Sequence, residues 1–187
     1  MSKYSKVVLV DENNKELGVM DKIKVHTDST PLHRGLSVFL FNNKNELLLQ
    51  QRAVSKLTFP GVWSNSCCGH PQPGEKEIEA ARRHMESELG IKEADIHLVL
   101  PDFRYTAEMN GIMENELCPV FVAFSDEQIT ANPKEVESIK WIGWDEFLEQ
   151  IKSNAGYYSK WSTEEALLLE KSPEFNQYRS LKTTNIA

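Results

Sequence analysis

Three histidines and two glutamates in this chain are residue types that metal sites use. His26 and His33 lie seven residues apart in a loop-like stretch, and His70 follows a Cys-Gly pair. Glu114 and Glu116 lead into a strand-like run, and the two-residue period of a strand puts both carboxylates on one side. Such a set of imidazoles and carboxylates suits Mn²⁺ or Mg²⁺. Taken singly, each histidine fits a structural role, so it is the combination that predicts a metal site.

A second pattern of glycines and charged residues runs from Gly69 to Ile91. It consists of Gly69, Glu75, Arg83, Glu88 and Gly90-Ile91. This spacing resembles the Nudix box, a loop–helix–loop that usually binds divalent metals on diphosphates. Carboxylates on a helix can hold Mg²⁺, which prefers oxygen ligands and often shares them with substrate phosphates. Where the box usually carries glutamate, this chain has His84 and Ser87. The pattern therefore argues against hydrolysis by the usual route, and for Glu88 a solvated helical carboxylate is the alternative.

Short β-rich runs and amphipathic helices must position these residues. Strand-like runs recur at 7–10, 36–41, 46–51, 96–100, 117–124 and 139–142, with a turn at 42–45. Between 75 and 90 the apolar residues Ile78, Ala81, Met85 and Leu89 recur in steps of three and four, which predicts a helix ended by Gly90. By helix geometry, Glu88 falls at the edge of this apolar stripe. Further helices are expected from 144 and from 163, and a frayed tail from about 183. Strands and helices without regular alternation predict an α/β fold, with a mixed β-sheet in an α/β/α sandwich.

Size and composition limit the class of protein. The 187 residues, of which 40 % are apolar and 26 % charged, fit a single globular domain over 1–187. No apolar run approaches the roughly 20 residues of a membrane span, and the N-terminus shows no signal-peptide core, which predicts a cytoplasmic protein. An odd number of cysteines, Cys67, Cys68 and Cys118, argues against a disulfide framework. The net charge of −7 without a basic stripe argues against nucleic-acid binding.

Several segments together resemble one family over nearly the whole chain. They are His26-Thr27, Leu32-His33-Arg34, the stretch 63–71 with its Asn-Ser-x-Cys-Gly-His-Pro motif, Asp102-Phe103-Arg104-Tyr105 and the stretch 114–120. These resemble type I isopentenyl-diphosphate isomerase, a Nudix-fold family in which the usual Nudix glutamates are lost. The resemblance implies a Nudix-like isomerase domain that interconverts isopentenyl and dimethylallyl diphosphate for isoprenoid precursor biosynthesis. Its partner would be this small-molecule substrate, and no obligatory protein partner is evident.

The resemblance also implies a role for individual residues. The metal ligands fall on His26, His33, His70, Glu114 and Glu116, for Mn²⁺ or Mg²⁺. The catalytic residues fall on Cys68, Glu116 and Tyr105, and Glu88 assists a second Mg²⁺ bound to the substrate diphosphate. Substrate binding falls on Lys22, Arg52, Lys56, Arg83 and Trp161. One position departs, because some members have a second arginine where this chain has His84.

The implied chemistry asks for these residue types. An unactivated double bond gains a proton and the neighbouring carbon loses one, through a tertiary carbocation, so the site needs an acid, a base and the exclusion of water. The ordinary pKa values, about 8.5 for a thiol and about 4.3 for a glutamate, must both be tuned by the surroundings. We assign Glu116 with Tyr105 as the donor and Cys68 as the base. The Trp161 face could stabilise the cation by about 2 kcal/mol when desolvated.

Each assignment has an alternative in which the residue has only a structural or surface role. Trp161 could belong to the core, Cys68 could be a small buried hydrophobe, and each cation could be a solvated surface charge. For the whole chain, the alternatives are a Nudix hydrolase of nucleoside diphosphate derivatives and a catalytically silent Nudix-like binding domain. The missing glutamates at His84 and Ser87 disfavour the hydrolase. The retained ligands and Cys68 disfavour the silent domain.

Overall fold

Two β-sheets and five helices make up the fold of residues 6–184, the part of the chain that the structure, a computed structural model, describes. One sheet has the strand order β2-β1-β3-β10-β9, and the other has the order β12-β5-β4-β11-β8, with β6 added on β5 and β7 added on β4. The strands are β1 (Lys6–Val10), β2 (Glu16–Asp21), β3 (His33–Arg34), β4 (Leu36–Phe41), β5 (Glu46–Arg52), β6 (Trp63–Ser64), β7 (Cys67–Gly69), β8 (Asp95–Leu100), β9 (Arg104–Met109), β10 (Ile112–Leu117), β11 (Val120–Phe124) and β12 (Val136–Gly143). The helices are α1 (Lys22–Val25), α2 (Glu77–Leu89), α3 (Trp144–Ser153), α4 (Lys160–Leu169) and α5 (Pro173–Thr184).

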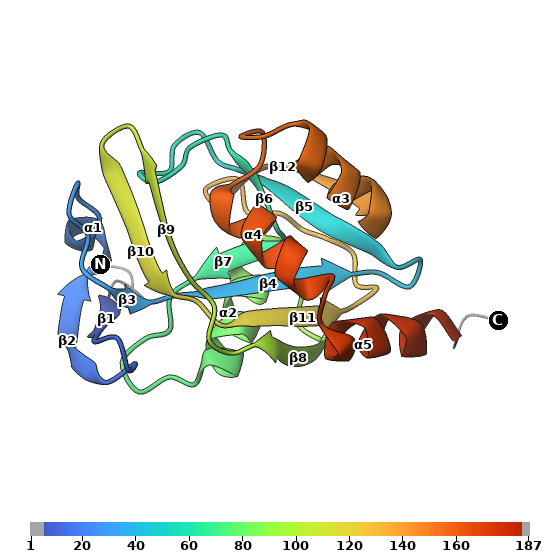
Figure 1. Cartoon of the computed structure of the whole chain (residues 1–187), viewed down its shortest axis with the longest axis horizontal. Helices are drawn as coiled ribbons and strands as arrows, with labels where there is room; N and C mark the ends of the chain where they lie inside the picture. Colours follow the sequence, from blue (N-terminus) through green and yellow to red (C-terminus); the bar gives the residue numbers. More distant parts are fainter. Residues whose placement is uncertain (1–5, 185–187) are drawn as a thin grey trace.

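Helices cover both faces of the larger sheet, as the predicted α/β/α sandwich requires (Figure 1). On one face, Leu36 and Leu40 of β4 pack in a core with Met85 of α2. On the other face, Phe39 of β4 packs in a core with residues of α3, α4 and α5, such as Trp144. Every residue of β4 is buried, because its alternating side chains enter the two cores in turn. The sheets are mixed as expected, but there are two of them rather than one.

Two neighbouring, parallel segments of the chain each leave the smaller sheet and enter the larger one, side by side. β3 continues into β4 across Gly35, and β10 continues into β11 across Cys118-Pro119, while β10 is parallel to β3 and β11 is parallel to β4. The prediction of one strand over 117–124 is therefore wrong. Pro119 has no N–H to give to a strand ladder, and its carbonyl accepts the Ser37 N–H at 3.1 Å. This junction brings β3, β7 and β10 together.

The helix of the Nudix-like pattern, α2, buries most of the predicted apolar stripe but not all of it. α2 ends at Gly90, whose φ of 76° is the left-handed conformation of a C-cap. Ile78 was assigned to the apolar stripe but is 38 % exposed. His84 and Glu88, one turn apart, lie on the buried face instead. Because Glu88 is only 4 % exposed, it is not a solvated helical carboxylate.

Several elements differ from the sequence-based expectation. α4 begins at Lys160 rather than at 163, because the Ser159 side chain caps the helix by accepting the Ser162 N–H. The strands β2 and β9 and the helices α1 and α5 were not predicted. α5 runs to Thr184, and 185–187 lie outside the described residues, so the frayed tail from about 183 stays a prediction. None of the helices between 6 and 184 is long and apolar enough to cross a membrane.

Candidate active site

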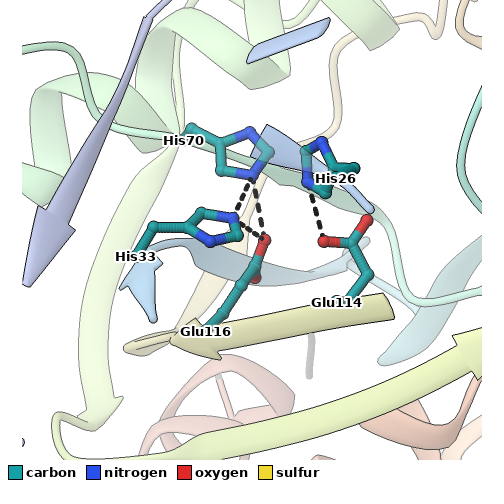
Figure 2. A group of neighbouring side chains, drawn as sticks. All are labelled: His26, His33, His70, Glu114 and Glu116. Atoms are coloured by element: carbon teal, nitrogen blue, oxygen red, sulfur yellow. Dashed lines mark hydrogen bonds and ion pairs between the residues drawn. The ribbon is translucent and has the colours of Figure 1, made fainter. Parts of the chain in front are cut away.

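The five predicted metal ligands lie together in one buried cluster (Figure 2). His26 follows α1, His33 is in β3, His70 follows β7, and Glu114 and Glu116 are in β10. The pairing of β10 with β3 sets His33 directly beside Glu116, and the two glutamates face the same side of β10, as the strand period predicted. One ligand atom from each of the five residues lies within 4.8 Å of all the others. Their role as ligands stays a prediction.

Backbone carbonyls orient two of the histidine rings. His26 Nδ1 lies 3.0 Å from the Lys22 carbonyl oxygen, and His33 Nδ1 lies 2.9 Å from the Pro31 carbonyl oxygen. A carbonyl oxygen only accepts hydrogen bonds, so each Nδ1 carries a proton in these contacts, and a neutral ring then keeps its lone pair on Nε2. The two Nε2 atoms point into the cluster. This is the tautomer in which protein histidines bind metals through Nε2.

The polar atoms in the cluster fit a shared cation better than they fit one another. His26 Nε2 and Glu114 Oε2 lie 2.9 Å apart, but neither atom has a hydrogen bond of acceptable geometry. With Nδ1 protonated, both facing atoms are acceptors, and two buried acceptors at this separation repel unless a cation lies near them. The nitrogen and carboxylate donors are also those that Mn²⁺ accepts. The residues present therefore fit a divalent metal.

The electrostatics of the cluster keep Glu116 and His70 in the protonation states that bind metals. Burial alone would raise the pKa of Glu116, but the hydrogen bonds from His33 and His70 outweigh it and hold that pKa well below its usual range. Burial lowers the pKa of His70 to about 3. For His33, burial works downward as well, but the hydrogen bond to Glu116 outweighs it and raises the pKa. At neutral pH the result is an anionic Glu116 beside a neutral His70, as metal ligation requires.

A close approach of the backbone to Glu116 leads to a first prediction. At Gly35, where β3 passes into β4, an added Cβ would overlap the Glu116 carboxylate. Gly35→Ala should therefore displace that carboxylate and lower both metal content and turnover, the latter by at least about tenfold, or about 1.4 kcal/mol. Metal content is measured by elemental analysis and turnover by substrate NMR.

The matched control for this prediction is Gly143→Ala. An added Cβ at Gly143 would meet nothing within 4 Å, and its φ of −62° suits alanine. This variant should keep its metal and its turnover. If Gly35→Ala matched Gly143→Ala in both measurements, the close packing around Glu116 would have no role in the site.

The neighbouring cysteines face opposite ways, as successive residues of a strand do. Cys67 is buried in the core beneath α2, and Cys68 is half-buried against the core on the other face. The Cys68 thiol donates a hydrogen bond to Asn65 Oδ1 at 3.2 Å, and Trp161 Nε1 donates to the same oxygen at 3.2 Å. Burial raises the pKa of Cys68 to about 12. Cys68 is therefore a protonated thiol at neutral pH, held beside the indole of Trp161.

Tyr105 joins this thiol region to the metal cluster. Its hydroxyl donates to Glu116 Oε2 at 3.1 Å, because the pairing of β9 with β10 sets the two residues side by side. Its ring centroid lies 5.4 Å from that of Trp161, which is 2 % exposed. Burial, and then the Glu116 carboxylate, raise the pKa of Tyr105 well above its ordinary value, so the phenol keeps its proton. A continuous line of contacts thus runs from Cys68 to Glu116.

Some of the predicted diphosphate contacts gather next to the metal cluster. A cavity of about 180 Å³ is lined by Lys22, Arg83 and Glu88, among others. Burial, and then repulsion by Lys56, lower the pKa of Lys22. Because a cation in such a place is poorly solvated, it gains from a bound anion. Lys22 and Glu88 thus line one cavity, and their roles toward phosphate oxygens and a shared cation stay predictions.

The other predicted cations have protein partners in this structure. Arg83 donates to Glu75 at 2.7 Å and to the His70 carbonyl at 3.0 Å. Lys56 forms an ion pair with Glu135. Arg52 donates to the carbonyls of the 58–59 loop, and its guanidinium lies over the Trp161 ring at 5.6 Å. These three side chains could reach phosphates only by exchanging or sharing those contacts.

His84, the residue without a predicted role, connects Glu88 to the cluster of histidines and glutamates through His70. Its Nδ1 lies 3.0 Å from Glu88 Oε1, and its Nε2 accepts the His70 N–H at 3.2 Å. An added Cβ at Gly69 would overlap the His84 ring, so the glycine of the motif makes room for it. Sequence reasoning missed this link, because only the fold brings the turn after β7 against α2.

Comparison with known proteins places the chain among named relatives. The family model for the NUDIX domain matches residues 31–162. Isopentenyl-diphosphate Delta-isomerase of Saccharopolyspora erythraea is 46 % identical over 156 residues, covering 83 % of this chain and 80 % of that protein. The Rhizobium rhizogenes protein of the same name is 45 % identical over 165 residues, covering 87 % and 79 %. The Clavibacter michiganensis one is 39 % identical over 182 residues, covering 97 % and 93 %.

Solved structures share the fold at low identity. A Deinococcus radiodurans protein has a TM-score of 0.67 at 21 % identity and covers 90 % of this chain and 99 % of its own. A MutT protein from Methanosarcina mazei has a TM-score of 0.60 at 17 % identity, covering 79 % and 95 %. At such identity the likeness concerns architecture alone, since unrelated functions share folds.

Proposed function

The chain belongs to the isopentenyl-diphosphate Delta-isomerases and carries a NUDIX domain, and from this premise we propose that it interconverts isopentenyl diphosphate and dimethylallyl diphosphate by moving a proton at carbon. The observation that carries the proposal is the line of contacts from Cys68 through Asn65, Trp161 and Tyr105 to Glu116. It places two groups that can transfer protons, Cys68 and Glu116, beside the rings of Trp161 and Tyr105. Such an arrangement suits proton exchange with a hydrocarbon, which needs positioned acids and bases in a dry site.

Substrate capture is assigned to the cavity beside the cluster. Lys22 is its poorly solvated cation, and we propose that it binds phosphate oxygens. Glu88 would hold an Mg²⁺ that the substrate diphosphate shares. The hydrogen bond of His84 to Glu88 fixes the direction of that carboxylate. Arg83 lines the same cavity, where it contacts the His70 carbonyl, and would bind the substrate diphosphate from there.

The two proton-transfer groups are Cys68 and Glu116, the latter with Tyr105. The sequence assigns donation to Glu116 with Tyr105, and acceptance to Cys68. In the substrate-free protein the protonation states are the reverse of this assignment. The Cys68 pKa of about 12 keeps Cys68 a protonated thiol, and the low pKa of Glu116 keeps Glu116 a carboxylate. The reaction is an interconversion, so the acceptor in one direction is the donor in the other. Both groups are therefore required in either direction.

The remaining residues stabilise what forms between these groups. The Trp161 ring presents a π face in a buried setting, where attraction to a cation is worth about 2 kcal/mol or more. Phe59 packs edge-on against this ring at 5.0 Å and helps to exclude water. His26, His33, His70, Glu114 and Glu116 would hold Mn²⁺ or Mg²⁺. When bound, this cation would supply fixed positive charge that keeps Glu116 in place and sets its basicity.

A direct assay separates isomerase from hydrolase and gives a second prediction. Isopentenyl diphosphate incubated with the protein and Mg²⁺ should yield dimethylallyl diphosphate by NMR, without a comparable release of phosphate or pyrophosphate. The reason is that His84 and Ser87 stand where hydrolytic Nudix boxes carry glutamate. Robust phosphate release from a panel of nucleoside diphosphate derivatives, with no isomer formed, would instead identify a hydrolase. A cytoplasmic location and a single domain over 1–187 stay predictions.

A further inference from the structure

Glu165 is a carboxyl group buried beneath the active site, and none of the roles above uses it. It lies on α4 one turn after Trp161 and is 0 % exposed. Its Oε2 accepts the Ser37 hydroxyl at 2.8 Å, and its Oε1 lies 3.9 Å from the Cys118 sulfur. A hydroxyl and a thiol compensate poorly for the loss of water around a carboxyl group. Stability therefore gives no reason for an acid at this position.

Ser37 connects Glu165 to the thiol of Cys68. The two residues pair directly between β4 and β7, and Ser37 Oγ lies 3.5 Å from Cys68 Sγ. A hydroxyl has one proton, and Glu165 Oε2 receives it, so Ser37 can only accept from its other neighbours. Even if Glu165 holds a proton on Oε1, Oε2 remains an acceptor. In agreement with this direction, the Asn65 amide donates to Ser37 Oγ at 2.8 Å.

Asn65 extends the same direction to Trp161. Its Nδ2 also donates to the carbonyls of Val38 at 3.0 Å and Cys67 at 3.2 Å, which turns Oδ1 toward the active site. That oxygen accepts from the Cys68 thiol and the Trp161 indole N–H, and also from the Ser64 hydroxyl at 2.8 Å. The two groups around the Cys68 sulfur, Ser37 Oγ and Asn65 Oδ1, thus both present lone pairs, and the thiol hydrogen points toward them.

We infer that Glu165 is a positioning residue: by accepting the hydrogen bond of the Ser37 hydroxyl, it fixes the direction of the Cys68 thiol hydrogen and, through Asn65, of the Trp161 indole. Without this acceptor, the Ser37 hydroxyl can turn its proton onto the Cys68 sulfur. There it would occupy a lone pair that proton exchange with carbon needs. The expected effect on turnover rests on the proposed function, but the arrangement of hydrogen bonds is testable without substrate.

Two substitutions at Glu165 separate hydrogen bonding from packing. Glu165→Met removes both oxygens at similar volume, whereas Glu165→Gln keeps an accepting oxygen for Ser37. We expect the methionine variant to lose at least about tenfold in kcat with little change in KM, and the glutamine variant to stay near wild type. The methionine variant should melt no lower than wild type, because a buried acid is lost. The control is Glu164→Gln at the half-buried neighbour, whose carboxylate lies 3.7 Å from Lys160 Nζ.

A spectroscopic signature reports the network directly. In ¹⁵N-labelled protein without substrate, the Trp161 indole N–H resonance, assigned with Trp161→Phe, should shift in Glu165→Met and Ser37→Ala but not in Glu165→Gln or Glu164→Gln. The Ser37→Ala/Glu165→Met double variant should lose no more activity than Ser37→Ala alone. A folded Glu165→Met with wild-type kcat and an unshifted resonance would overturn the inference. The predicted shifts in a wild-type protein that fails to isomerise would support the network and contradict only the proposed function.

Discussion

Removal of divalent metal should lower isomerisation by at least about three orders of magnitude, or about 4 kcal/mol of barrier, and added Mn²⁺ or Mg²⁺ should restore it. The chain has a net charge of −7 and must bind a substrate with several negative charges. Its buried cluster contains facing acceptor atoms, such as His26 Nε2 and Glu114 Oε2, that no hydrogen bond satisfies. The measurement is substrate NMR on protein whose metal content is followed by elemental analysis. Undiminished turnover in verified metal-free protein would contradict the metal site.

A substitution within the cluster should give the same result. His33→Ala removes the imidazole beside Glu116 and should lower both bound metal and turnover, because it takes one ligand and one hydrogen bond from the cluster. The control is His97→Ala. His97 lies on β8 outside the cluster, 3.0 Å from Asp95 and stacked on Tyr178. It should change neither quantity, so a parallel loss in both variants would indicate unfolding rather than loss of a ligand.

Strand and helix periods correctly predicted which side chains share a face. The two-residue period put Glu114 and Glu116 together on one side, which the structure confirms, and the same period separates Cys67 from Cys68. Such patterns hold because each face of these strands meets a different environment. The same reasoning placed Glu88 at the edge of the buried stripe of α2, where it is indeed buried.

Other features depend on contacts that local patterns do not contain. The passage of one strand run into two sheets at Pro119 depends on the parallel pairing with β3 and β4. β2 was missed because it is an edge strand with no buried residue, so its apolar residues do not mark a side that faces the core. β9 did carry a signal, since the buried residues Tyr105 and Ala107 alternate with exposed polar ones. Ser172-Pro173, an N-cap residue followed by proline, likewise marked the start of α5.

The supporting residues of the site were the hardest to predict. Glu165 has its partner Ser37 at 128 residues' distance in the chain, and His84 meets His70 only through the packing of α2 on β7. Neither side chain follows a spacing rule. In the sequence, Glu165 is simply an acidic residue in a leucine-rich helix. Such a residue is normally expected to be exposed, so the sequence gives no sign that it is buried.

The thiol of Cys68 should be essential for isomerisation. Cys68→Ala and Cys68→Ser should each lower turnover by at least about three orders of magnitude, or roughly 4 kcal/mol, while the fold is kept. The thiol exchanges a proton with carbon in the proposed mechanism, and a serine hydroxyl is far less acidic than a thiol. Asn65 and Ser37 also orient the Cys68 thiol, which packs against the core cluster that contains Trp161. Turnover is measured by substrate NMR, and thermal melting of each variant shows whether a lost rate reflects lost folding.

The adjacent Cys67 is the matched control, since it differs from Cys68 only in the face to which it points. It is fully buried in the core beneath α2, so Cys67→Ala should cost about 1 kcal/mol of stability and leave turnover close to that of wild type. The contrast between the two variants tests the strand geometry as well as the chemistry. A folded Cys68→Ala with near-full turnover would exclude the thiol from the reaction. Proton exchange would then have to be assigned to Glu116 and Tyr105 alone, whose hydroxyl-to-carboxylate contact of 3.1 Å offers the remaining route.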